Sequence, residues 1–258
     1  MCILAIAYNV HPQFPLILIT NRDEFYNRPT LPIHSWQKEG HPEIIAGKDL
    51  EAGGTWLGMH QNGNLGILTN YRDLKNIKLN APSRGHIITE YLLSGQTAFE
   101  YLQQLKTNAQ NYNGFNLILS DNESLYHYSN HTNEITRMEP GIYGLSNAVL
   151  DTPWPKLVKL KTDFTKAIEQ NNLQPAHLFQ ILKNQEKADD SALPQTGLDY
   201  QMEKAVSSIF IQTPNYGTRC STLLFIQKDK SFKITERLYD QNGNEVQDNS
   251  IESTLHAN

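Results

Sequence analysis

The second residue of the chain, Cys2, has the side chain with the clearest capacity for chemistry. A cysteine is small enough to permit removal of Met1, and that removal would leave a thiol and a free α-amine on the same α-carbon. An α-amino group has an unperturbed pKa of about 7.7–8.0, so a useful fraction is neutral near pH 7 and can accept the thiol proton directly or through one water. Cys2 is therefore a candidate nucleophile with its own base.

A run of four polar residues, Asn21-Arg22-Asp23-Glu24, directly follows a short apolar segment. Residues 2–8 and 16–20 are rich in β-forming side chains and are joined by a polar loop, which predicts a hairpin buried on both faces. The end of its second strand lies beside the start of the first, so we expect Asp23 or Arg22 within reach of Cys2. The alternative is a solvated strand end whose ion pairs contribute at most about 1 kcal/mol.

Two more unusual segments flank a predicted strand at residues 65–69. Residues 53–58 place three glycines around Trp56, which is typical of a tight turn or of a close approach to the backbone. The strand itself follows an Asn-Gly turn and ends in Asn70-Tyr71-Arg72, so an amide and a guanidinium again come after a buried strand. Asn70 has the alternative role of capping a turn, which is the commoner one for asparagine.

A late strand carries one further guanidinium. Arg219 precedes the apolar strand 221–227, and a guanidinium in such a place needs a partner or a ligand. It also precedes the second cysteine, Cys220, whose thiol pKa it could lower. An unreactive strand cysteine is the favoured interpretation of Cys220.

The remaining pattern predicts an α+β protein. Apolar residues recur at helical spacing in four segments, whereas residues 28–50 combine prolines and histidines without periodicity and predict a long surface loop. Because strands dominate both ends and helices form blocks between them, a doubly wound parallel sheet is disfavoured. The predicted helices are 83–93, 97–109, 156–170 and 175–184, and the further strands are 115–120, 125–129, 135–138, 209–212, 221–227 and 231–237.

Composition limits the classes of partner. The chain has 258 residues, 39% of them hydrophobic and 19% charged, and its net charge of -5 leaves no global basic face for nucleic acid. We expect one domain over residues 1–258. Two cysteines suit a reducing compartment, so we expect a cytoplasmic protein, and no apolar run is long enough to predict a membrane span.

Several common catalytic patterns are absent from the sequence. There is no phosphate-binding glycine loop, no His-Glu-x-x-His and no Cys-x-x-Cys. The segment 144–148, Gly-Leu-Ser-Asn-Ala, lacks the final glycine of a serine-hydrolase elbow. His127 and His131 flank a predicted turn, which is a weak indication of a metal site, and we predict none.

Eight segments together resemble one family, the NRDE proteins known in animals as transport and Golgi organisation protein 2. They run in family order from residue 1 to about residue 222, which makes the resemblance specific. The segments are Met1-Cys2-Ile3, Asn21-Arg22-Asp23-Glu24-Phe25, Gly53-Gly54-Thr55-Trp56-Leu57-Gly58, Leu68-Thr69-Asn70-Tyr71, Tyr112-Asn113-Gly114-Phe115-Asn116-Leu117, Tyr143-Gly144-Leu145-Ser146-Asn147, Thr152-Pro153-Trp154 and Tyr216-Gly217-Thr218-Arg219.

That family is in turn distantly similar to N-terminal-nucleophile hydrolases of the choloylglycine hydrolase and penicillin V acylase type. The resemblance implies a four-layer αββα sandwich, with Cys2 as nucleophile, Asp23 contacting the amine and thiol, and a late arginine supporting the thiolate at Arg219. Asn70 and Asn147 match the two oxyanion asparagines. The chain departs from the pattern at Thr20, where those hydrolases usually carry an arginine, and Arg22 is the nearest guanidinium.

The resemblance thus leads to two hypotheses about function. The first is a hydrolase of a C–N bond, an amide of a small and partly apolar ligand, that needs no cofactor. The alternative is a non-catalytic carrier that binds haem, acyl-CoA or lipid in the same cleft. In either case we expect ligand contacts from the polar strand ends and the glycine-rich turn, that is from Asn21, Arg22, Glu24, Trp56, Tyr71 and Arg72.

Overall fold

The computed structural model describes residues 2–256 of the chain. Contacts divide them into two compact units, each built on one antiparallel sheet. Unit 1 contains residues 2–27 and 140–253, and unit 2 contains residues 28–139 and 254–256. Unit 1 is therefore assembled from both ends of the chain, while unit 2 is nearly continuous in sequence.

The sheet of unit 1 has six strands in the order β10-β1-β2-β11-β12-β13. Its first strand lies between two partners, so the start of the chain is held inside the sheet rather than at its edge. The strands are β1 (Cys2–Tyr8), β2 (Leu16–Phe25), β10 (Gly141–Leu145), β11 (Tyr216–Ile226), β12 (Ser231–Tyr239) and β13 (Glu245–Thr254).

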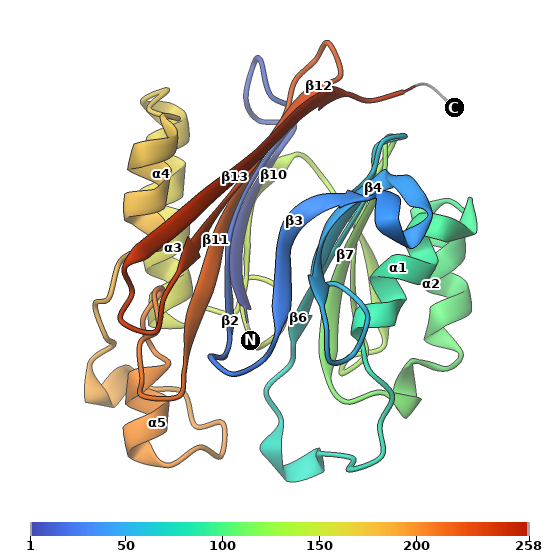
Figure 1. The fold of residues 1–258 in the computed structure, drawn as a ribbon. Coiled ribbons are helices and arrows are strands. Elements are labelled where there is room, and N and C mark those ends of the chain that lie inside the picture. Colours follow the sequence, from blue (N-terminus) through green and yellow to red (C-terminus); the bar gives the residue numbers. More distant parts are fainter. Residues whose placement is uncertain (1, 257–258) are drawn as a thin grey trace. The chain divides into compact units, whose positions relative to one another are not determined.

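Two helices, α3 (Pro155–Glu169) and α4 (Pro175–Leu182), cover one face of this sheet (Figure 1). Both begin with a proline in their first turn, where the missing N–H is not needed. Alternate residues of the central strands, such as Ile3, Ile19 and Leu223, pack against the helices in one apolar core. Because side chains alternate along a strand, the residues between them lie on the opposite face. A short helix, α5 (Tyr200–Ala205), precedes β11.

Unit 2 repeats the plan with a seven-stranded sheet in chain order from β3 to β9. Helices α1 (Gly85–Ser94) and α2 (Ala98–Lys106) pack on one face of it (Figure 1). Thr97 caps α2 through reciprocal hydrogen bonds with Glu100. The strands are β3 (Thr30–Trp36), β4 (His41–Asp49), β5 (Leu57–His60), β6 (Asn64–Asn70), β7 (Phe115–Asp121), β8 (Leu125–Ser129) and β9 (Glu134–Met138). The short 3-10 turns of unit 2 are η1 (Gln37–Glu39), η2 (Leu74–Asn76) and η3 (Ala109–Asn111), and η4 (Asp190–Ala192) lies in unit 1.

The α+β class predicted from the sequence is confirmed, since each unit has one antiparallel sheet with helices in separate blocks. The N-terminal hairpin and the four longer helices are also confirmed to within a few residues. The stacking of the two sheets in four layers and the single domain over the whole chain stay predictions. No helix among residues 2–256 is long and apolar enough to cross a membrane.

The predicted loop at residues 28–50 is wrong, because β3 and β4 form a strand pair there. The prolines that argued against strands are tolerated for a physical reason. Strand β3 is the edge of its sheet, and its register shifts between Leu31 and His34, on either side of Pro32.

Three other differences concern unit 1. The predicted strand at residues 209–212 makes only an isolated bridge, from Gln212 to Gly217. Strand β2 does not end at Thr20 but runs on to Phe25, because β11 begins at Tyr216 and pairs with those extra residues. Strands β10 and β13 were not predicted.

Candidate active site

A row of three side chains crosses strands β1, β2 and β11 of the unit 1 sheet at the level of Cys2. In the register, Cys2 of β1 lies opposite Arg22 of β2, and Arg22 lies opposite Cys220 of β11. Directly opposed residues point to the same face, with Cβ atoms about 4.5–5.5 Å apart. Their neighbours Ile3 and Asn21 face the helices, so this row lies on the face opposite to α3 and α4. The sheet therefore places a buried guanidinium between two thiols.

The Cys2 thiol is held in an environment that opposes ionisation. The residue is only 8% exposed, and burial is the largest cause that raises the thiol pKa above its ordinary value. The Asp23 carboxylate raises the pKa further, whereas the Arg22 guanidinium and a backbone hydrogen bond from Asp23 lower it. The resting thiol is consequently protonated at neutral pH, and a nucleophilic role requires a base to take its proton.

The Asp23 carboxylate is buried and fixed by its neighbours on β11. Its Oδ1 accepts a hydrogen bond of 2.7 Å from the Thr218 hydroxyl, and that hydroxyl accepts one of 2.9 Å from the backbone N–H of Ile211. The Tyr216 hydroxyl donates to the backbone carbonyl of Asp23 at 3.1 Å. Asp23 is thus held next to Arg22, at the strand end that carries Cys2.

Asn147 reaches the same end of the sheet from β10. Strands β1 and β10 are antiparallel, with Leu145 opposite Leu4. Asn147, two residues after Leu145, therefore comes level with Cys2, two residues before Leu4. The intervening Ser146 hydroxyl donates to the backbone carbonyl of Cys2 at 3.5 Å and lies 3.4 Å from Oδ1 of Asn147. A buried side-chain amide therefore stands beside the candidate nucleophile, as an oxyanion donor must.

Arg219 occupies a β-bulge. Asp23 pairs with Thr218 and Arg22 with Cys220, so Arg219 is an extra residue in β11. Its Nη1 donates to the Phe25 carbonyl at 2.8 Å, and burial and the nearby Arg22 lower its pKa. Glu24 also acts on Arg219, while its Oε1 accepts from the backbone N–H of Phe25 at 2.9 Å. Arg219, at the bulge, and Glu24, which pairs with Gly217 of β11, are both half-buried at the same end of the sheet as Cys2.

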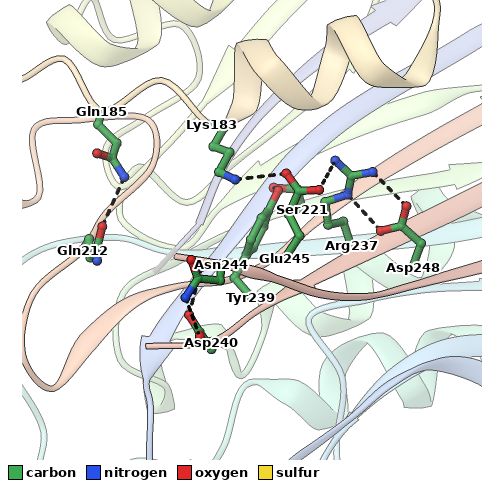
Figure 2. Close-up of polar contacts among 10 residues, drawn as sticks. All are labelled: Lys183, Gln185, Gln212, Ser221, Arg237, Tyr239, Asp240, Asn244, Glu245 and Asp248. Carbon is green, nitrogen blue, oxygen red and sulfur yellow. Dashed lines mark hydrogen bonds and ion pairs between the residues drawn. The ribbon is translucent and has the colours of Figure 1, made fainter. Parts of the chain in front are cut away.

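Asn21 differs from the ligand contact that the sequence led us to expect. Its Nδ2 donates to the carbonyls of Leu182 and Ile209, at 2.8 and 3.0 Å, and its Oδ1 accepts from the Ser221 hydroxyl at 2.6 Å. The side chain is fully buried and faces the helices. Tyr239, drawn with Ser221 in Figure 2, donates to that hydroxyl at 3.1 Å. All polar atoms of the Asn21 side chain are used inside the unit, which gives it a structural role.

The other expected site residues are Trp56, Asn70, Tyr71 and Arg72, and all lie in unit 2. They gather at one end of its sheet. Asn70 is the last residue of β6, and the backbone N–H of Leu68, two residues before Asn70, donates a hydrogen bond to the Trp56 carbonyl. The Tyr71 ring stacks on His131 with centroids 4.1 Å apart. Arg72 is buried. Their meeting with Cys2 in one site stays a prediction.

Sequence reasoning missed one buried acid, Glu236. It is 2% exposed and forms a hydrogen bond with the Cys220 thiol. The sequence contained a signal for this buried acid. Every second residue of the strand is apolar, at Phe232, Ile234 and Leu238, and Glu236 stands in the same series. An acid at an inward position of a strand indicates a buried charge.

Unit 1 also contains a pocket of ≈ 480 Å³, which Cys2, Arg22 and Cys220 do not line. Amide and hydroxyl side chains line most of it, and at one wall Gln185 donates to Gln212 at 3.2 Å (Figure 2). Lys187 adds one positive charge, so the lining favours polar groups.

The described residues, 2–256, contain no group of three His, Cys, Asp or Glu side chains that could hold a metal ion. His127 lies 3.4 Å from Asn116, whereas His131 stacks on Tyr71, so the two histidines form no common site.

Comparison with known families and proteins gives a consistent result. The family described as "Transport and Golgi organisation 2" matches residues 1–241. The mouse and human Transport and Golgi organization 2 homologues are 34% and 33% identical to this chain, over 100% of both chains. The Drosophila melanogaster protein is 25% identical, over 92% of this chain and 91% of its own.

Two solved structures are similar at low sequence identity. One is a Caenorhabditis elegans N-acylethanolamine-hydrolyzing acid amidase ortholog, 10% identical, with a TM-score of 0.44 over 86% of this chain and 92% of that one. The other is a C2A mutant of the conjugated bile acid hydrolase from Clostridium perfringens, 9% identical, with a TM-score of 0.47 over 100% and 97%.

Proposed function

Because this chain belongs to the Transport and Golgi organisation 2 family, whose motifs resemble those of N-terminal-nucleophile hydrolases, we propose that it hydrolyses the C–N bond of a small amide. One observation supports this most. Four of the five residues expected to act in catalysis, Cys2, Asp23, Asn147 and Arg219, come from separate strands or strand ends of unit 1 and gather at one end of its sheet.

In the proposed reaction, the Cys2 thiol gives its proton to the α-amine that Met1 removal exposes. The thiolate then attacks the amide carbon, and the carbonyl oxygen becomes an oxyanion. Asn147 stabilises that charge, and one such donor is typically worth about 3 kcal/mol of barrier. Asn70, the other asparagine that the resemblance implies, stays a prediction. The C–N bond breaks as the leaving nitrogen takes the proton from the amine.

A thioester on Cys2 remains, together with a released amine. Water then attacks the thioester carbon, and the α-amine accepts a proton from that water. The C–S bond breaks, a carboxylic acid leaves, and the thiol is restored. Asp23 orients the amine throughout, and the two arginines supply positive charge to the thiolate, which matters because burial raises the Cys2 pKa.

The test is incubation of the purified protein with a panel of N-acyl amides whose acyl chains differ in length. We expect release of amine and, by intact mass, a transient acyl adduct on the N-terminal peptide. Cys2→Ala should abolish both, and Asn147→Ala should lower the rate about 100-fold or more. The exposed Asn108→Ala is the matched control and should leave the rate unchanged. Amine release that persists in Cys2→Ala would refute the proposal.

A second candidate is a non-catalytic carrier of haem, acyl-CoA or lipid. Burial, which raises the pKa of the Cys2 thiol, favours it, since a thiol with a raised pKa is a poor nucleophile without a base. Haem titration distinguishes the two functions. A Soret band that weakens in Cys2→Ala or in a histidine variant supports the carrier, because thiolate and imidazole ligate haem iron.

We also propose that the protein is cytoplasmic. Both of its cysteines are free and buried thiols, and neither is paired in a disulfide. A reducing compartment keeps such thiols available for chemistry.

A further inference from the structure

The row of Cys2, Arg22 and Cys220 is joined by an acid that the proposed reaction does not use. Glu236 of β12 lies opposite Thr222 of β11, which is two residues beyond Cys220. Side chains two residues apart share a face, so Glu236 projects from the same face as the row. Strands β2, β11 and β12 thus bring the Arg22 guanidinium and the Glu236 carboxylate to the Cys220 thiol.

Arg22 and Glu236 are both charged groups inside the unit, 6% and 2% exposed. Burying either charge alone is costly, so each requires a compensating group. Both act on Cys220. Burial is the largest cause that raises the pKa of the Cys220 thiol, and Glu236, which forms a hydrogen bond with that thiol, raises the pKa further. Arg22 lowers it. The guanidinium and the carboxylate therefore reach Cys220 from its two neighbouring strands.

Cys220 itself does not fit a redox role with Cys2. Strand β2 lies between their strands, so their Cα atoms are separated by two strand spacings, about 9–10 Å. A disulfide needs Cα atoms closer than about 7 Å. Cys220 instead acts as a neutral donor, because its thiol stays protonated beside Glu236.

We propose that Glu236 is a positioning residue that competes with the Cys2 thiolate for the positive charge of Arg22. In the resting protein Glu236 and Cys220 draw the guanidinium toward β12, and less of its charge is available to Cys2. When the Cys2 thiolate forms, the Arg22 guanidinium stabilises its negative charge instead. This inference rests on the proposed function, in which Cys2 is the nucleophile, and it assigns the strength of that nucleophile to a residue two strands beyond Arg22.

The other groups around Cys2 leave room for such control. Ser146 and Asn147, which approach from β10, are uncharged, so the charged side chains near the thiol come from β2, β11 and β12 among the described strands of unit 1. These charged or titratable side chains are Arg22, Asp23, Glu24, Arg219, Cys220 and Glu236. The positive charge of the amino terminus also lowers the pKa of the Cys2 thiol and is the same in every variant compared below.

The experiment measures how fast iodoacetamide alkylates Cys2 as a function of pH, with peptide mass separating Cys2 from Cys220. It needs no substrate, so its outcome is independent of whether amide hydrolysis is found. Arg22→Gln should slow Cys2 alkylation at pH 7.5 at least about threefold, because it removes the charge that lowers the thiol pKa. Glu236→Gln should accelerate it by a similar factor. Glu252→Gln, the same change at an exposed residue of β13, should have no effect.

The double variant Arg22→Gln/Glu236→Gln decides the mechanism. If Glu236 acts through Arg22, the double variant should alkylate at the rate of Arg22→Gln alone. An acceleration that persists without Arg22 would overturn the proposal, and so would an unchanged rate in Glu236→Gln. If Glu236→Gln fails to fold, the double variant, which removes both buried charges, still provides the comparison with Arg22→Gln. Arg22→Lys should restore most of the parent rate.

Discussion

The two faces of the unit 1 sheet bury polar groups in opposite ways. On the helix face, Asn21, Ser221 and Tyr239 form a chain of hydrogen bonds that ends on backbone carbonyls. On the other face, one residue further along the same strand, Arg22 lies between two thiols. Neutral groups that satisfy one another stabilise a fold, whereas a buried guanidinium beside thiols keeps charge available for chemistry.

This comparison shows that position in the sequence is a poor guide to role when a strand is buried on both faces. Asn21 and Arg22 are adjacent, both are polar, and their distances from Cys2 in the sequence differ by one residue. Only the pairing register separates them, because a shift of one residue exchanges the two faces.

The largest expected effect is loss of stability in Asn21→Leu. The change leaves the Leu182 and Ile209 carbonyls and the Ser221 hydroxyl without their partner in the helix-face core. We expect a loss of about 3 kcal/mol in the free energy of unfolding, measured by urea denaturation. The pH profile of Cys2 alkylation should stay the same. If Asn21→Leu were as stable as the parent and altered the pH profile of Cys2 alkylation, the roles assigned to the two faces would be wrong.

Asp23→Asn should affect the reactivity of Cys2 instead. The Asp23 carboxylate raises the thiol pKa, so its neutralisation should shift the alkylation profile to lower pH and raise the rate at pH 7.5 at least about threefold. The same variant should lose amide hydrolysis, because the α-amine is no longer oriented. A parallel fall in alkylation and hydrolysis would show that Asp23 supports the thiolate rather than opposing it.

Tyr239→Phe tests the outer end of the hydrogen-bond chain. Only the bond to Ser221 is removed, while the ring keeps its edge-to-face contact with Phe210 at 4.9 Å. We expect a loss of about 1 kcal/mol by urea denaturation and no change in Cys2 alkylation. Stability equal to that of the parent would mean that the chain is not cooperative at this position.

The smallest effect is expected at the ion pairs of β12 and β13. Arg237 binds both carboxylate oxygens of Asp248 at 2.8 Å and also contacts Glu245, which pairs with Lys183 (Figure 2). Because the Asp248 side chain is 48% exposed, Asp248→Asn should cost only about 0.5 kcal/mol at pH 7.

The pH dependence of that difference has a defined sign. The Arg237 bond lowers the folded-state pKa of Asp248, so the pair stabilises the fold above the unfolded pKa of an aspartate. Its contribution disappears as the pH falls through the folded value. Below that pH, parent and Asp248→Asn should unfold at the same urea concentration, and a constant difference down to acid pH would contradict the assignment.

The sequence indicated much of the Cys2 end, but through different signals. Cys2 was indicated by its chemistry next to the amino terminus, Asp23 by following an apolar strand and Arg219 by preceding one. Asn147 was indicated only by the family resemblance. The structure brings these four residues together at one end of the sheet. The bulge at Arg219 was not predictable, since it depends on how β11 pairs with a distant strand. Asn21 and Glu236 were misjudged or missed because their roles depend on which face of a strand meets the helices.

The fold was predictable where periodicity was strong, as in the N-terminal hairpin and the four longer helices. It failed where a local signal opposed tertiary context. Pro32 and Pro42 suggested a loop, but both are accommodated in β3 and β4. Strand β13 is mostly polar and exposed, so it shows no apolar alternation and was missed.

The most direct test of the account is the mass of the N-terminal peptide of the purified protein before and after reaction with an activated acyl ester. We expect Cys2 as the first residue, and we expect one acyl group to be added to it and then lost in water. A chain that retains Met1, or an acyl group found on Cys220 and never on Cys2, would contradict the proposal that Cys2 is a nucleophile with its own base.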